Sequence, residues 1–186
     1  FKNGQIPWSE GYDNYKKKYI HKSLNDNNLL NQFKEKKIPS NYGYRIDERV
    51  VEYPWLFSRI TNNNQEILDA GSTFNFDFIV SHKKIKENNL TIYTFAPEFK
   101  SHNSEHISYV YGDLRNLPFK NELFDIVVSH STIEHIDMDN SLYGYDLPYN
   151  RNVNDKSYEY IIAVKEMIRV LRKGGNLLLT FPYGKF

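Results

Sequence analysis

The sequence lacks cysteine, a strong net charge and any long apolar run. With no cysteine among its 186 residues, it can form neither disulfides nor thiolate metal sites, which is compatible with the cytoplasmic location that we expect. Its 24 basic and 23 acidic side chains give a net charge of +1, so no electrostatic feature favours nucleic acid as a partner. No apolar run reaches the roughly 18 residues that a membrane span needs. Composition therefore favours a globular protein.

Apolar residues make up 40% of the chain and aromatic residues 16%, which is enough to form a core. Their spacing divides the chain into two parts. Residues 1–62 show apolar residues at helical intervals and predict a helical N-terminal cap, in which Pro54 is expected to bend or end a helix. The three asparagines at 62–64 predict a turn into the second part, residues 63–186.

The second part alternates short apolar runs with helical patterns. This alternation predicts an α/β fold, a parallel sheet with helices on both faces. The best helix is 155–172, which Asp155 would cap and Gly174 would end. Its predicted inner face consists of Tyr160, Val164, Met167, Ile168 and Leu171. The predicted strands are 66–70, 90–95, 107–111, 125–130 and 176–181.

Three blocks carry the chemistry. The strand 66–70 contains Asp69 and runs into the turn at Gly71 and Ser72, where backbone can approach a ligand beyond the carboxyl end of the strand. An ordinary strand-to-helix turn would look the same. The second block, 111–129, joins an acidic turn and a Leu-Pro-Phe loop to a strand that opens with Phe-Asp, and the third, 166–180, joins a helix end to a leucine-rich strand.

In this order and spacing, the three blocks resemble the class I S-adenosylmethionine-dependent methyltransferases. The resemblance covers about 66–183 and implies a Rossmann-like sheet with S-adenosylmethionine as cofactor. Such domains usually continue beyond their fifth strand. We therefore expect that the last strands are missing, that the domain is truncated after its fifth strand, and that a C-terminal segment or a second copy in a homo-oligomer covers the edge at 176–181.

The resemblance also implies cofactor contacts. Asp113 and Leu114 occupy the adenine positions, although Asp113 could instead cap its own turn. Asp69 could hold water or the cofactor ammonium group, or be satisfied by backbone amides alone. The residues implied at the methionine end are Gly71, Ser72, Ser129 and His130.

Two departures from the family pattern affect the cofactor site. Thr73 and Asn75 stand where further glycines are usual, and Asn tolerates left-handed backbone better than most residues. Thr94 stands near the position of the acid that binds the ribose hydroxyls. Glu98, four residues later, could substitute for that acid or could be a solvated carboxylate at the start of a helix.

The segments 131–140 and 47–55 narrow the resemblance to a subgroup often associated with bacterial surface-polysaccharide synthesis. This implies O-methylation of a small-molecule or saccharide acceptor: a sugar, nucleotide-sugar or phosphorylated metabolite. A hydroxyl acceptor needs a general base, for which His135 is the first candidate, with Glu134 or Asp137 as its orienting partner. An anionic phosphate oxygen would need no base, and His135 could then be structural.

Two other functions remain open. Asp137 and Asp139 form an Asp-x-Asp pair that a nucleotide-sugar glycosyltransferase could use to hold a metal ion. The motif departures are also compatible with a non-catalytic module that keeps the fold. No metal is expected for a methyltransferase here, because His102 and His106 have the spacing of a zinc helix but lack its glutamate.

Overall fold

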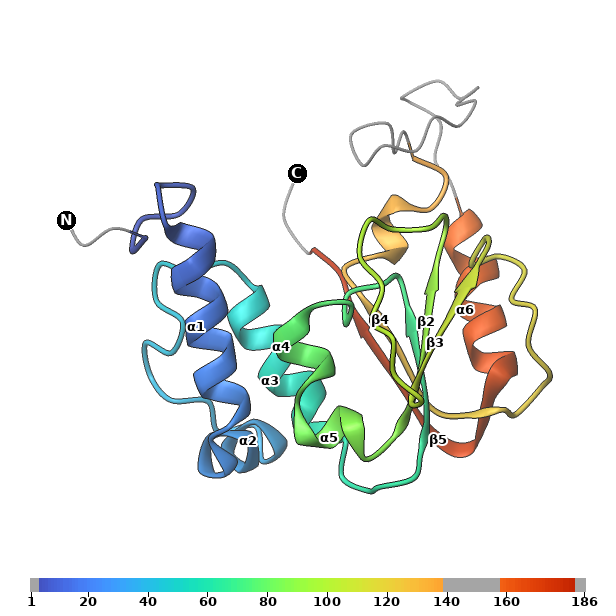
Figure 1. Ribbon diagram of the computed structural model, residues 1–186, viewed down its shortest axis with the longest axis horizontal. Helices are drawn as coiled ribbons and strands as arrows, with labels where there is room; N and C mark the ends of the chain where they lie inside the picture. Colours follow the sequence, from blue (N-terminus) through green and yellow to red (C-terminus); the bar gives the residue numbers. More distant parts are fainter. Residues whose placement is uncertain (1–3, 139–157, 183–186) are drawn as a thin grey trace.

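A computed structural model describes residues 4–138 and 158–182. They form a five-stranded, wholly parallel sheet in the order β3-β2-β1-β4-β5, with helices on both faces (Figure 1). This confirms the predicted α/β, Rossmann-like fold. All five strands were predicted; four differ from the prediction by at most one residue at either end, whereas β5 begins five residues earlier than predicted. They are β1 (Glu66–Ala70), β2 (Asn89–Thr94), β3 (Ile107–Tyr111), β4 (Phe124–His130) and β5 (Leu171–Thr180).

The two faces of the sheet have separate cores. Because successive strand residues point to opposite faces, Ile67 and Ile126 pack against the N-terminal helices, whereas Leu68 and Val127 pack toward α6. Figure 1 shows α6 on one side of the sheet and the other helices on the opposite side. The helices are α1 (Tyr12–Leu24), α2 (Asn27–Lys34), α3 (Arg49–Arg59), α4 (Asp77–Val80), α5 (Lys83–Lys86) and α6 (Glu159–Val170). Of the described helices, none is long and apolar enough to cross a membrane.

Helix α3 continues through Pro54, so the prediction that this helix could end there is wrong. Proline has no N–H to donate to the carbonyl four residues earlier, which belongs to Val50. The Tyr42 hydroxyl donates to that carbonyl at 3.0 Å instead. A side chain from outside the helix therefore satisfies the acceptor that proline leaves without its helical partner.

The C-terminal helix is shorter than predicted. Its last residue is Val170, because β5 begins at once with Leu171, so Gly174 lies within the strand and does not end the helix. The predicted cap Asp155 lies outside the described residues.

The predicted inner face of this helix is also partly wrong. The fully buried residues of α6 are Ala163, Met167 and Val170, whereas Tyr160 is exposed and Ile168 is 56% exposed. Only one narrow side of α6 packs on the sheet. Helix α6 has apolar residues on more than one side, so the 3.6-residue period alone could not identify the side that is buried.

Strand β5 pairs with β4 and lies at the edge of the sheet as far as the structure describes the chain. The position of this strand therefore agrees with the edge position that the sequence predicts. That a second copy or a further segment covers this edge stays a prediction.

Candidate cofactor and active site

The turn after β1 is organised by a buried carboxylate. Asp69 is completely buried and accepts hydrogen bonds from the backbone N–H groups of Thr73 (3.2 Å) and Phe74 (2.6 Å) and from the Thr73 hydroxyl (3.1 Å). Burial raises the pKa of Asp69 to about 7, although these hydrogen bonds act in the opposite direction. Asp69 thus shapes the turn through backbone amides, and its direct contact with a ligand stays a prediction.

Gly71 and Ser72 bring this turn against the loop that follows β4. Gly71 has φ 136°, and a Cβ atom there would lie 2.1 Å from Oγ1 of Thr132, so only glycine fits. Ser72 has φ 63°, a left-handed conformation that is costly for a residue other than glycine. Its buried hydroxyl has no hydrogen-bond partner among the described residues. The turn therefore presents a strained backbone and a buried hydroxyl that a ligand could bind.

The end of β4 is tied to the N-terminal helices. His130 is completely buried and shares a hydrogen bond of 2.6 Å between its Nε2 and Oε2 of Glu52, a residue of α3. The hydroxyl of Ser131 donates to the other Glu52 oxygen at 3.1 Å, and Arg49 lies 3.5 Å from the carboxylate. Glu52 was not predicted as a site residue, because nothing in the sequence relates it to a strand end 78 positions later.

Burial, hydrogen bonds and neighbouring charges shift the pKa values of both groups in this pair. Burial opposes ionisation of Glu52, but hydrogen bonds from His130 and Thr180 and the charge of Arg49 lower its pKa to about 2. Burial also lowers the pKa of His130 below its ordinary value, against the opposing effect of Glu52. At neutral pH Glu52 is therefore ionised, and its carboxylate is bound to the Nε2 side of the His130 ring.

Two further buried atoms at the end of β4 lack partners within the described part of the chain. They are the other ring nitrogen of His130, Nδ1, and the hydroxyl of Ser129. Buried polar atoms without partners are uncommon and often mark a place where a ligand or water binds. Ser129 and His130 thus lie where the sequence predicts the methionine end of the cofactor, but His130 already uses one nitrogen to hold α3.

The turn after β3 is more exposed, and its carboxylate is hydrogen-bonded by a residue of the same turn. Both carboxylate oxygens of Asp113 accept hydrogen bonds from the Arg115 guanidinium, at 2.6 to 3.0 Å, and Arg115 also pairs with Glu159 of α6 at 3.0 Å. Burial opposes ionisation of Asp113, but the hydrogen bonds and charge of Arg115 lower its pKa overall. Leu114 packs beside it against the core under α6. An adenine amine would therefore share Asp113 with Arg115 or displace it.

Glu98 lies on an exposed loop after β2. Its Oε2 accepts from Nδ2 of Asn75 at 2.7 Å, and its Oε1 lies 3.4 Å from the hydroxyl of Thr94. No helix lies between β2 and β3, both of which are within the described residues, so the alternative of a helix-start carboxylate is wrong. Glu98 is thus held beside the end of β2, where the sequence predicts an acid for the ribose hydroxyls.

The predicted catalytic residues follow β4. Glu134 and His135 lie in a short 3-10 helix, η1 (Ile133–His135), and Asp137 follows with φ 61°. The buried Oε2 of Glu134 has no hydrogen-bond partner among the described residues. Burial raises the pKa of Glu134, while His135 and Arg49 act against this increase. The fold therefore places Glu134 within electrostatic reach of both His135 and the Arg49 side of α3.

The described residues offer no cluster of metal ligands. Asp139, the second residue of the Asp-x-Asp pair, lies outside the described residues. Over residues 4–138 and 158–182, no three His, Cys, Asp or Glu side chains form a group that could hold a metal ion.

Comparison with known proteins settles the family. A family model described as a methyltransferase domain matches residues 83–179, which is more than half of the chain. The chain belongs to this methyltransferase family. S-adenosylmethionine is the methyl donor that membership implies, and membership favours the methyltransferase over the glycosyltransferase alternative. No curated protein matches the domain.

The solved structures to which this methyltransferase domain is similar share little sequence with it. A putative methyltransferase from an antibiotic biosynthesis pathway of Anabaena variabilis has 15% identity and a TM-score of 0.43, over 63% of this chain and 38% of that one. A putative methyltransferase from Bacillus halodurans has 20% identity and a TM-score of 0.41, over 62% and 44%. The CurJ carbon methyltransferase has 11% identity and a TM-score of 0.48, over 90% and 48%. The domain thus spans less than half the length of each.

The strand ends of the methyltransferase domain fit its cofactor. Ser72 and Ser129 offer buried hydroxyls without partners in the described chain, at the ends of the two central strands, β1 and β4. Glu98 offers an exposed carboxylate at the end of β2, the type of group that accepts from ribose hydroxyls. Asp113 fits less directly because Arg115 already binds both of its oxygens. We therefore expect Ser72, Ser129 and Glu98 to hold the cofactor, with Asp113 in competition between Arg115 and adenine.

Proposed function

We propose that the protein transfers a methyl group from S-adenosylmethionine to an oxygen of a sugar, nucleotide-sugar or phosphorylated metabolite. The observation that carries this proposal is the group of buried polar atoms without described partners on Ser72, Ser129 and Glu134. They come from the β1 turn, the end of β4 and the loop that follows it. The contact between Gly71 and Thr132 brings these segments together.

The cofactor supplies an electrophilic methyl group, and the protein must align the acceptor and handle its proton. In the proposed reaction, His135 takes the proton from an acceptor hydroxyl, and Glu134 orients its ring. The loop carrying both residues is anchored at its start, because Thr132 donates to the His130 carbonyl at 3.1 Å and Ser131 donates to Glu52. Correct orientation of reacting groups can supply roughly 7–11 kcal/mol of barrier reduction, so a fixed loop favours catalysis.

The proposed class of acceptor is supported by a sequence resemblance and not by the buried polar atoms. The segments 131–140 and 47–55 resemble methyltransferases associated with bacterial surface-polysaccharide synthesis, and the structure brings described parts of both together through Glu52 and Ser131. The precursors of surface polysaccharides that would serve as acceptors are expected in the cytoplasm. A chain without cysteine is compatible with that location. The fold by itself does not choose the acceptor.

The test has two steps. Calorimetry with S-adenosylhomocysteine measures cofactor binding first, and incubation with labelled S-adenosylmethionine and a panel of sugars, nucleotide-sugars and sugar phosphates then measures methyl transfer. We expect binding and transfer to at least one acceptor of the panel. If S-adenosylhomocysteine does not bind, the proposed function is wrong. Binding without transfer to any member of the panel would overturn the proposed acceptor class.

A further inference from the structure

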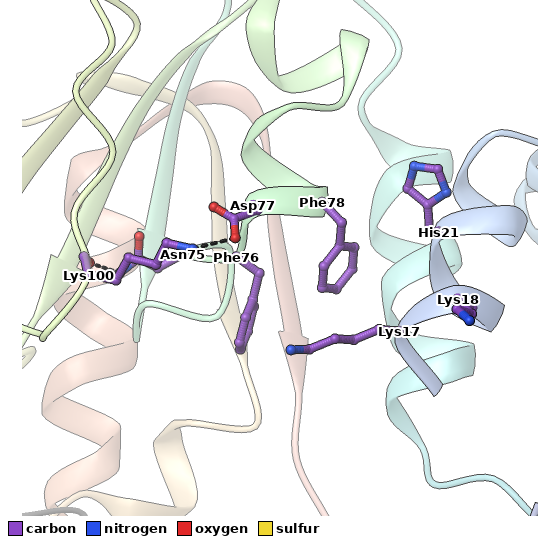
Figure 2. A pocket seen from close by; sticks show the side chains of 8 residues that line it. All are labelled: Lys17, Lys18, His21, Asn75, Phe76, Asp77, Phe78 and Lys100. Carbon is purple, nitrogen blue, oxygen red and sulfur yellow. Dashed lines mark hydrogen bonds and ion pairs between the residues drawn. The ribbon is translucent and has the colours of Figure 1, made fainter. Parts of the chain in front are cut away.

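A groove of about 510 Å³ lies between α1 and the segment that follows the β1 turn (Figure 2). Helix α1 contributes Lys17, Lys18 and His21 to one wall, and the segment 75–78 contributes the other. Sites for small molecules commonly have volumes of roughly 300–1,000 Å³, so the groove is large enough for a metabolite. It has no role in the contacts predicted from the family resemblance.

The groove carries an excess of positive charge. Lys17 and Lys18 are exposed, and in the part of the chain that the structure describes neither makes a hydrogen bond or an ion pair. The carboxylate that lines the groove, Asp77, is already paired with Lys100, and His102 lies 3.7 Å from it. The charge of Lys17 also acts on Asp77, but the residues that line the groove still carry two more ammonium groups than carboxylates, which favours an anion.

The same groove has an aromatic floor. The rings of Phe76 and Phe78 stack with their centroids 5.8 Å apart and their planes at 27°. Phe76 is 43% exposed, so one face of its ring is accessible from the groove. In Figure 2 the Lys17 side chain extends from α1 toward both rings. Cationic groups next to an exposed aromatic face suit a ligand that combines an anion with a ring.

The wall of the groove is connected to the predicted cofactor site by Asn75. This buried side chain donates to Glu98 at 2.7 Å and to the Lys100 carbonyl at 2.9 Å, and it accepts from the Tyr109 hydroxyl at 2.9 Å. Its amide therefore has a fixed orientation. One side of Asn75 faces the groove, and its amide holds the carboxylate expected to bind the ribose.

We propose that this groove binds a phosphate-bearing ligand, with the phosphate on the ammonium group of Lys17, which Figure 2 shows extending toward the rings, and an attached ring on Phe76; Lys18, farther along the groove wall, adds positive charge. Lysine is a common phosphate ligand, and aromatic side chains stack on the flat rings of nucleotides. Resting on the proposed function, we identify this ligand as the methyl acceptor. The acceptor class then narrows to nucleotide-linked or phosphorylated compounds and excludes the free sugars.

The test uses calorimetry with two probes, uridine diphosphate and inorganic pyrophosphate. We expect the wild-type protein to bind both, with uridine diphosphate the tighter, and each affinity to fall as salt is added. The double variant Lys17→Glu/Lys18→Glu should weaken binding of both probes by on the order of tenfold or more. Phe76→Ala should weaken binding of uridine diphosphate alone, because pyrophosphate has no ring.

The matched control is Lys86→Glu/Lys120→Glu, which reverses two exposed lysines elsewhere and should leave both affinities unchanged. The proposal is overturned if the wild-type protein binds neither probe, or if the control variant weakens binding as much as the groove variant. S-adenosylhomocysteine binding, measured on the same proteins, should be equal in all of them. Its absence from the wild-type protein would sink the proposed function while leaving phosphate binding in the groove as a separate result.

Discussion

The two ends of the predicted cofactor site are built in different ways. At the end of β1 and β4, the polar groups are buried, and Glu52 reaches His130 across 78 positions of sequence. At the end of β3, Asp113 is partly exposed and binds Arg115, only two positions away. The first end depends on the packing of α3 on the sheet, whereas the second is a local turn. We therefore expect substitutions at the first end to affect stability and catalysis, and those at the second to affect cofactor affinity alone.

The largest effect is expected for His135→Ala. If the acceptor is a hydroxyl, loss of the general base should lower kcat by about 100-fold to 10,000-fold and leave the dissociation constant of S-adenosylhomocysteine unchanged. The control is His106→Ala, an exposed histidine near the start of β3. Wild-type turnover in His135→Ala would remove this residue as the base and favour an acceptor oxygen that is already anionic.

The next effect concerns the buried pair. Glu52→Gln should lower the free energy of unfolding at pH 7 by about 1–3 kcal/mol, because one amide oxygen cannot accept from both His130 and Ser131 as the carboxylate does. Chemical denaturation measures this loss. Glu48→Gln, an exposed carboxylate of the preceding turn, is the control and should have little effect. An equal loss in both variants would show that the pair has no special role.

This pair also predicts a dependence on pH. Folding lowers the pKa of both groups, so the folded state binds fewer protons than the unfolded state and the stabilisation exists above the unfolded pKa values. The His130 contribution should be lost as the pH falls below 6.5, and the Glu52 contribution as it falls from 4.5 toward 2. In Glu52→Gln the second loss should disappear. An acid profile as steep as that of the wild-type protein would contradict the assignment.

A smaller effect is expected at the β3 end. Asp113→Ala should weaken binding of S-adenosylhomocysteine by about 1–3 kcal/mol, the usual penalty for leaving a buried donor unpaired, and should leave the folded protein nearly as stable. Calorimetry and thermal unfolding test the two statements, with the exposed Glu105→Ala as the control. An unchanged dissociation constant would exclude Asp113 from the adenine site.

The smallest effect is expected for Arg115→Gln, which tests whether the β3 end is a self-contained local turn. Arg115 competes with adenine for Asp113, and an ion pair as exposed as this one contributes about 0.2–1 kcal/mol. Removal of the guanidinium in Arg115→Gln should therefore strengthen S-adenosylhomocysteine binding by about 1.4-fold to 5-fold, as measured by calorimetry. Weaker binding would mean that Arg115 positions the carboxylate for the cofactor and does not compete with it.

The sequence alone was sufficient for the features that depend on short-range pattern. Alternating apolar runs located all five strands, and the acidic turn at Asp113 and the glycine turn at Gly71 were recognisable from their neighbours. These features depend on residues within a few positions of one another, so local propensity and periodicity determine them. Local periodicity gave the wrong boundary where a helical pattern and a strand overlap, at the end of α6. Leu171 fits the helical spacing, but it pairs with Phe124 of β4 and is the first residue of β5.

Only the tertiary structure decided which distant residues meet. Tyr42 satisfies the carbonyl that Pro54 leaves unpaired, Glu52 pairs with His130, and Thr132 closes on Gly71. Each of these contacts joins residues that are far apart in the sequence or in different loops. They meet because of how the helices and loops pack on the sheet, and no local sequence pattern predicts that packing. The charged groove arises in the same way, because Lys17 and Phe76 meet only when α1 lies against the segment after β1.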